Sequence, residues 1–312
     1  MDKRAAIVLA VIFGGLFIVL FGFMLLAYSA VKSSTSVNLS DVETTAGARV
    51  AIVEARGTIG DRENGVDSEK IAKLLRKYEK DDDIKAIVLR VDSPGGAVAP
   101  SQEIYGALKR IKAKKKVIVS MGNLAASGGY YISAPADKIY AEPGTLTGSI
   151  GVIFMHFNVR GLLEWAKVDQ TTLKTGKYKD TLSPFRSLQE TDREEIQSLS
   201  DDVYGQFVSA VAEGRKLPEA RVREIAEGRI YTGRKAKELK LVDELGGLDE
   251  AVQAAWTLAG QSGEAKVQYA PKDRELSLRD LMRGMFQGAA EGVKSAAQGS
   301  SGVQLLAPSL VR

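Results

Sequence analysis

The first residue that could do chemistry is a serine in a cluster of small residues. Ser127 lies in the stretch VIVSMGNLAASGGYYIS, residues 117–133, between an apolar β-type run at 117–121 and an apolar, partly aromatic segment. A strand, a tight turn and a helix in that order present one hydroxyl group at a strand end, surrounded by backbone N–H groups. The pattern predicts that Ser127 is a nucleophile, although many serines occupy such turns for packing alone.

A glycine loop, DSPGG at 92–96, follows a second apolar run at 84–91. Proline fixes one turn dihedral, and the two glycines permit a positive φ and the close approach of another backbone. Loops at the carboxyl ends of parallel strands meet at one edge of the sheet, where sites form. The N–H groups of Gly96 (less securely Gly95) and Gly128 could then form an oxyanion hole. The alternative is a βα turn without a catalytic role.

A nucleophilic serine needs a base. The 312 residues include one histidine, His156, in the apolar run VIFMHFNV, where a structural role is expected. A carboxylate or a neutral lysine remains, and the loop-like segment 175–186 offers Lys177 and Lys179. A lysine that acts near pH 7 needs its pKa lowered by about three units from about 10.4, through burial and nearby donors. The residue pattern does not choose between these lysines.

The composition excludes several kinds of site. The chain has no cysteine, so thiol nucleophiles, disulfides and thiolate metal sites are excluded, and a single histidine excludes zinc sites built from several. No metal or cofactor is therefore expected. The net charge is +4, and the one dense basic run, at 109–116, ends a predicted helix. Cations there suit a solvated helix end, so no nucleic-acid partner is expected.

The chain begins with an apolar segment, residues 5–31. It is longer than the roughly 20 residues that a membrane-spanning helix needs and than the roughly 7–15-residue core of a signal peptide. Lys3 and Arg4 precede it, which predicts a cytoplasmic N-terminus and an outer domain beyond the membrane. A cleaved signal peptide, with small residues at Ala27, Ser29 and Ala30, is the alternative. We expect a cytoplasmic stub and transmembrane helix over 1–32 and a polar linker over 33–48.

The remainder is predicted to form one α/β domain, residues 49–271. Strands at 49–59, 84–91 and 117–121 alternate with helices at 68–80 and 101–112, which is typical of parallel βαβ units. Further short strands are expected at 138–141, 149–154 and 171–174, and further helices at 159–168, 191–214, 218–227, 234–239 and 248–259. The polar tail, 272–312, is expected to be partly flexible.

Five motifs together resemble one family. They are VDSPGG (91–96), MGNLAASGGYYIS (121–133), TGSIGV (147–152), TGKYKD (175–180) and GRIYTG…LVDELGGLDEA (228–251). They are similar to those of the membrane-anchored signal peptide peptidases of the SppA type, relatives of the Clp protease and crotonase folds. Lys240 departs from the family pattern, which commonly has glycine before Leu-Val-Asp.

The resemblance implies roles for individual residues. It assigns the nucleophile to Ser127, the general base to Lys179 and the orientation of that lysine to Ser149. The oxyanion donors fall on Gly96 and Gly128. It also implies a Clp protease/crotonase-like βαβ spiral fold and a ring-shaped homo-oligomer on the membrane. The implied substrates are hydrophobic peptides, chiefly signal-peptide remnants.

The expected function is a single-pass serine endopeptidase of the cell membrane, with a Ser127/Lys179 dyad in an extracytoplasmic domain. One alternative is a crotonase-type enzyme that acts on acyl-CoA thioesters, which usually needs carboxylates at the site. The other is a membrane scaffold with an inactive protease fold.

Overall fold

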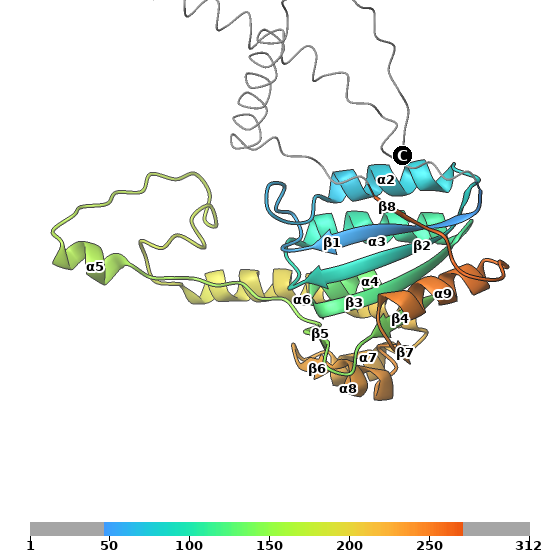
Figure 1. Cartoon of the computed structure of the whole chain (residues 1–312). Helices are drawn as coiled ribbons and strands as arrows, with labels where there is room; N and C mark the ends of the chain where they lie inside the picture. Colours follow the sequence, from blue (N-terminus) through green and yellow to red (C-terminus); the bar gives the residue numbers. More distant parts are fainter. Residues whose placement is uncertain (1–46, 271–312) are drawn as a thin grey trace, which may run out of the picture. The chain divides into compact units, whose positions relative to one another are not determined.

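The computed structural model describes residues 47–270 (Figure 1). The predicted transmembrane helix at 1–32, nearly all of the linker and the tail at 272–312 lie outside these residues. Between residues 47 and 270, no helix is both long enough and apolar enough to cross a membrane.

Three long parallel strands form the centre of the sheet: β1 (Arg49–Arg56), β2 (Ile84–Ser93) and β3 (Lys116–Ala126). Their apolar runs are rich in β-branched residues, which favour strands buried on both faces. The shorter strands are β4 (Lys138–Ala141), β5 (Leu146–Gly148), β6 (Ile230–Thr232), β7 (Glu244–Leu245) and β8 (Val267–Tyr269). The main order is β6-β5-β3-β2-β1-β8, with β4 between β3 and β7, and β6 runs antiparallel to β5.

Helices cover both faces of the sheet (Figure 1). Helices α2 (Ser68–Glu79) and α3 (Val98–Lys112) pack on one face, where Leu75 and Leu108 share a core with alternate strand residues. Helix α9 (Leu248–Leu258) packs on the other face, where Trp256 joins a second core. Each strand therefore contributes alternate side chains to two apolar layers.

Four further helices complete the body of the domain. They are α4 (Gly128–Ser133), α6 (Glu190–Arg215), α7 (Glu219–Ile225) and α8 (Gly233–Glu238). Phe207 and Val211 of α6 are buried in the main core, so the second half of this long helix is part of the domain body.

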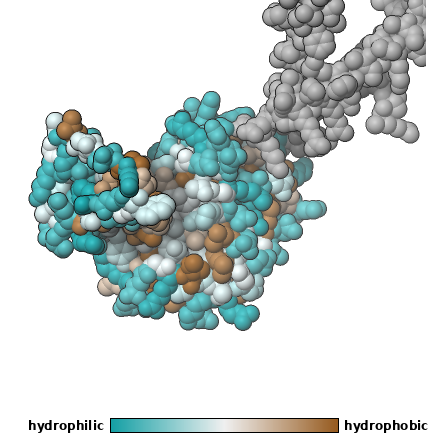
Figure 2. Space-filling model, turned by 90° about the vertical axis from the view of Figure 1, so that its left-hand side faces the viewer, coloured by the Kyte–Doolittle hydropathy of each residue, from teal (hydrophilic) through white to brown (hydrophobic). Residues whose placement is uncertain are grey.

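A segment that we call the arm, residues 154–189, projects from the body and contains the short helix α5 (Arg160–Trp165) (Figure 1). Many of its hydrophobic side chains are exposed, including Trp165 at 81% and Leu173 at 93%. Figure 2 views the molecule from this side and shows hydrophobic patches among hydrophilic surface. So many exposed apolar side chains on one segment indicate a contact surface.

The α/β class and the parallel βαβ pattern are confirmed, but two predicted strands are wrong. No strand forms at 149–154. Strand β5 ends just before this segment, at Gly148, because Gly148 (φ 83°) and Ser149 (φ 50°) leave the extended conformation. The predicted strand at 171–174 lies on the arm, where no neighbouring strand pairs with it. Strand β3 also runs past the predicted end at Met121, because residues 124–126 pair with β5.

Candidate active site

Ser127 sits between the end of β3 and the start of α4 in a backbone conformation that side chains rarely adopt. Its φ is 53° and its ψ is −120°. Such a conformation costs on the order of 1–3 kcal/mol and persists only where the surroundings enforce it. Here the Ser127 N–H donates to the Gly148 carbonyl (2.8 Å), and the Tyr131 N–H donates to the Ser127 carbonyl (2.9 Å). The strained turn places the half-buried Ser127 side chain at the edge of a cavity, as nucleophile turns do.

Two backbone N–H groups lie beside this hydroxyl without a hydrogen-bond partner among residues 47–270: those of Gly96 and Gly128. A Cβ atom at residue 128 would lie 3.2 Å from the Gly96 nitrogen, so the two amides are neighbours. A Cβ atom at Gly95 (φ 100°) would lie 2.7 Å from the Gly128 nitrogen and 2.8 Å from the Ser127 Cβ. The two loops thus touch backbone to backbone, and the arrangement is one that an oxyanion hole requires.

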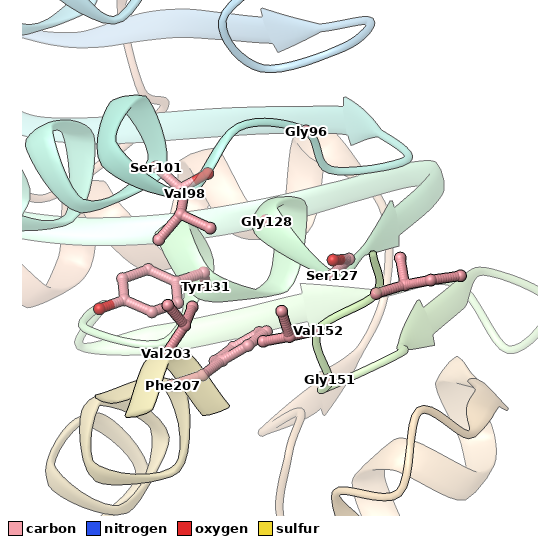
Figure 3. A pocket seen from close by; sticks show the side chains of 11 residues that line it. Gly96, Val98, Ser101, Ser127, Gly128, Tyr131, Gly151, Val152, Val203 and Phe207 are labelled. Carbon is pink, nitrogen blue, oxygen red and sulfur yellow. The ribbon is translucent and has the colours of Figure 1, made fainter. Parts of the chain in front are cut away.

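A cavity of about 120 Å³ opens next to Ser127 (Figure 3). Val98, Tyr131, Val203 and Phe207 gather at one end, and the Ser127 hydroxyl lies at the other. The full lining is Gly96, Val98, Ser101, Ser127, Gly128, Tyr131, Gly151, Val152, Ile153, Val203 and Phe207. This space is large enough to take a small aliphatic side chain.

The cavity wall is apolar and, within the described residues, contains no carboxylate. Besides Ser127, two lining residues carry hydroxyl groups, Ser101 and Tyr131, and the Ser101 hydroxyl donates to the Ala97 carbonyl at 2.8 Å.

The backbone of Ser149 lies close to that of Ser127. The residue before Ser149 is Gly148, and its carbonyl accepts a hydrogen bond from the Ser127 N–H. Ser149 is half-buried, and its own N–H donates to the Arg229 carbonyl at 2.7 Å. Ser149 does not belong to the cavity lining. Its position beside the nucleophile is compatible with the predicted role in orienting a lysine.

The structure does not bring either candidate lysine into the cavity of the same chain. Lys177 and Lys179 are both exposed on the arm and neither lines the cavity. Lys177 lies over the Tyr178 ring, with its Nζ 5.1 Å from the ring centroid. His156 is also on the arm, with its Nε2 atom 2.9 Å from the Ser183 carbonyl oxygen, so it does not serve Ser127 here.

An ion-pair network holds the turn that carries Lys179. Asp180 accepts hydrogen bonds from Arg186 (2.9 Å) and Lys174 (2.5 Å), and Arg186 also binds Asp192 in the first turn of α6. Hydrogen bonds from Arg186 and Lys174 lower the pKa of Asp180 to about 2. Hydrogen bonds from Arg186 and from the Gln189 N–H likewise lower the pKa of Asp192. Both carboxylates therefore stay charged near neutral pH and tie the lysine turn to α6.

Sequence reasoning missed the cavity wall that α6 supplies. Val203 and Phe207 lie one helical turn apart on the apolar face of this helix, a pattern that usually indicates only core packing. The pattern shows which face is apolar but not that part of this face borders an open space, because that depends on the tertiary position of α6.

Comparisons with known proteins agree with these observations. The sequence profile of peptidase family S49 matches residues 109–262, and that of Clp protease matches residues 49–145. The chain is 45% identical over 233 residues to a putative protease of Synechocystis, covering 73% of this chain and 77% of that protein. It is 42% identical over 181 residues to a putative signal peptide peptidase SppA of Enterococcus faecium, covering 58% of this chain and 53% of that protein.

A third relative, the chloroplastic serine protease SPPA of Arabidopsis thaliana, is 32% identical over 237 residues, which are 75% of this chain. The chain spans about a third of that longer protein (35%) and about half of the Enterococcus protein. The Synechocystis relative, by contrast, is matched over most of its length. From these matches and the parallel-rich α/β fold, we conclude that the chain belongs to peptidase family S49, a family of serine-type proteases.

Proposed function

We propose that this chain is an endopeptidase that uses Ser127 to cleave apolar peptides. One observation carries the proposal: the strained Ser127 stands beside two unpaired N–H groups at the mouth of an apolar cavity. The Ser127 Oγ attacks the peptide carbonyl carbon, and the N–H groups of Gly96 and Gly128 bind the resulting oxyanion. Each such donor is worth about 2.7–4 kcal/mol of transition-state stabilisation.

The base in this proposal is Lys179 of a neighbouring copy. Lys179 is exposed on a projecting arm whose hydrophobic side chains lack cover within the described chain. If the arm of one copy packs against the body of the next in a ring, it carries Lys179 toward Ser127 and Ser149 of that neighbour. Removal of water at such an interface favours the neutral form of a lysine, which a general base requires.

The proton then follows one route through the reaction. Neutral Lys179 takes the proton of Ser127 as its oxygen bonds to the carbonyl carbon, and the lysine then gives this proton to the leaving amine. Water hydrolyses the acyl-enzyme with the same lysine as base. A hydrogen bond from Ser149 to the lysine would hold it in line with Ser127.

The proposed substrates are hydrophobic peptides, chiefly signal-peptide remnants that stay in the membrane after export. The apolar cavity supports this, as does the name of the Enterococcus relative, a putative signal peptide peptidase. The apolar segment at 5–31 supports a single-pass location in the cell membrane, with the catalytic domain outside the cytoplasm.

The cavity predicts a preference for the residue before the scissile bond. Peptides with alanine, valine or leucine there should be cleaved, and those with aspartate or lysine should not. Val203→Phe would fill part of the cavity, so kcat/KM for the leucine peptide should fall about tenfold or more while that for the alanine peptide changes little. Fluorogenic peptides that differ only at this residue provide the measurement.

Leu199→Phe is the matched control, because Leu199 lies one turn earlier on α6, is 47% exposed and does not line the cavity. This variant should keep the wild-type preference. Equal loss on the leucine and alanine peptides in Val203→Phe would show that the cavity does not hold this side chain.

A further inference from the structure

The loop between β1 and α2, residues 57–67 (GTIGDRENGVD), holds the oxyanion glycine from the side opposite Ser127. The Ile59 N–H donates to the Gly95 carbonyl at 2.8 Å, and the Ala97 N–H donates to the Ile59 carbonyl at 2.9 Å. These two bonds flank Gly96 and form an isolated parallel β-bridge between Ile59 and Gly96.

The bridge determines where the Gly96 amide points. Its bonds use groups of Gly95 and Ala97, so the N–H of Gly96 itself faces away from Ile59. On that other side lies Gly128, with the Gly96 nitrogen 3.2 Å from the place of a Cβ at residue 128. A Cβ on Gly96 (φ 153°) would lie 2.2 Å from the Ile59 carbonyl oxygen, so the loop and the glycine are in backbone contact.

Ile59 is itself held in place by a closed turn. Its side chain is buried, the Gly60 N–H donates to the Val66 carbonyl, and the Val66 N–H donates to the Thr58 carbonyl, both at 2.9 Å. The tip of the turn is closed by one carboxylate. Asp61 Oδ1 accepts hydrogen bonds from the N–H groups of Glu63 and Asn64, each at 3.0 Å.

We propose that Asp61 is a positioning residue of the oxyanion hole. By closing the 61–64 turn, its carboxylate keeps Ile59 against Gly96 and so directs the Gly96 N–H toward the carbonyl oxygen of the substrate. The proposal rests on the proposed function of Ser127. Because Asp61 does not line the cavity, its loss should affect the transition state more than substrate binding.

The test compares Asp61→Ala with Asp61→Asn, because the asparagine oxygen can accept the same two N–H bonds. Asp61→Ala should lower kcat about tenfold with KM within about twofold, since the amide is loosened and not removed. A peptide aldehyde, which forms an oxyanion on Ser127, should bind more weakly by a similar factor. Asp61→Asn should keep both kcat and the affinity for the peptide aldehyde close to those of the wild type. Glu63→Ala, which removes a neighbouring charge but none of these bonds, should behave as wild type.

Hydrogen exchange of the Ala97 amide, which bonds to Ile59, gives a readout that does not depend on activity. Exchange should be faster in Asp61→Ala than in wild type and Asp61→Asn. Unchanged exchange or kcat in Asp61→Ala, or equal loss in Asp61→Asn, would overturn the role of Asp61. A wild-type protein that cleaves no peptide would contradict the proposed function, and the exchange rates would still decide whether Asp61 holds the segment next to Gly96.

Discussion

Ser127→Ala should lower kcat on an apolar peptide by at least about 10⁴-fold, while leaving substrate binding nearly unchanged. The hydroxyl is the atom that bonds to the carbonyl carbon, and alanine at this position offers no replacement. The substitution removes one oxygen at a half-buried turn, and the backbone bonds from Ser127 to Gly148 and from Tyr131 remain available. Steady-state hydrolysis of a fluorogenic peptide, with thermal unfolding to confirm folding, gives the measurement.

Ser133→Ala is the matched control for this result. Ser133 is a buried serine at the end of α4, the short helix that follows Ser127. Its hydroxyl donates to the Gly129 carbonyl at 2.7 Å and does not line the cavity. Its loss should cost about 1 kcal/mol of stability and leave hydrolysis within a few-fold of wild type. Similar activity in Ser127→Ala and Ser133→Ala would remove Ser127 from the mechanism.

Lys179→Ala should lower kcat by about 10²–10⁴-fold, the range for loss of a general base. Lys177→Ala is the control, because Lys177 is also an exposed lysine and lies two residues earlier on the arm. It should retain wild-type hydrolysis. A larger loss in Lys177→Ala than in Lys179→Ala would reassign the base, and near wild-type activity in both would show that no lysine of this turn activates the serine.

Because the proposed dyad joins two copies, the two inactive variants should complement each other. Co-expressed Ser127→Ala and Lys179→Ala chains, carrying different tags and purified as mixed oligomers, contain some sites with both groups intact. With random mixing in a ring, about a quarter of the sites are complete, so about a quarter of wild-type activity should return. Mixed oligomers without activity would show that the serine and the lysine do not act across copies.

The sequence predicted the parts of this structure that depend on local patterns. The apolar runs of β1, β2 and β3 and the apolar faces of α2 and α3 are each legible in a short window. The sequence also predicted that Gly96 and Ser127 lie close together, because their loops leave the carboxyl ends of neighbouring parallel strands.

Other features could not be predicted because they depend on distant parts of the chain. The run 149–154 reads as a strand by composition, yet it pairs with no other strand, and Ile153 and Phe154 are exposed. The contribution of Ile59 to the Gly96 loop comes from an isolated bridge between residues far apart in sequence. The choice between Lys177 and Lys179 also has no local physical signal, since both are exposed on one turn.

The most direct measurement is covalent labelling with a peptidyl phosphonate that carries leucine before the phosphorus. The serine oxygen displaces a leaving group at phosphorus, and the phosphoryl oxygen takes the place of the oxyanion between Gly96 and Gly128. We expect one adduct per chain, located on Ser127 by peptide mapping and absent from Ser127→Ala. An adduct on another residue, or none in a protein that cleaves the matching peptide, would contradict Ser127 as the nucleophile.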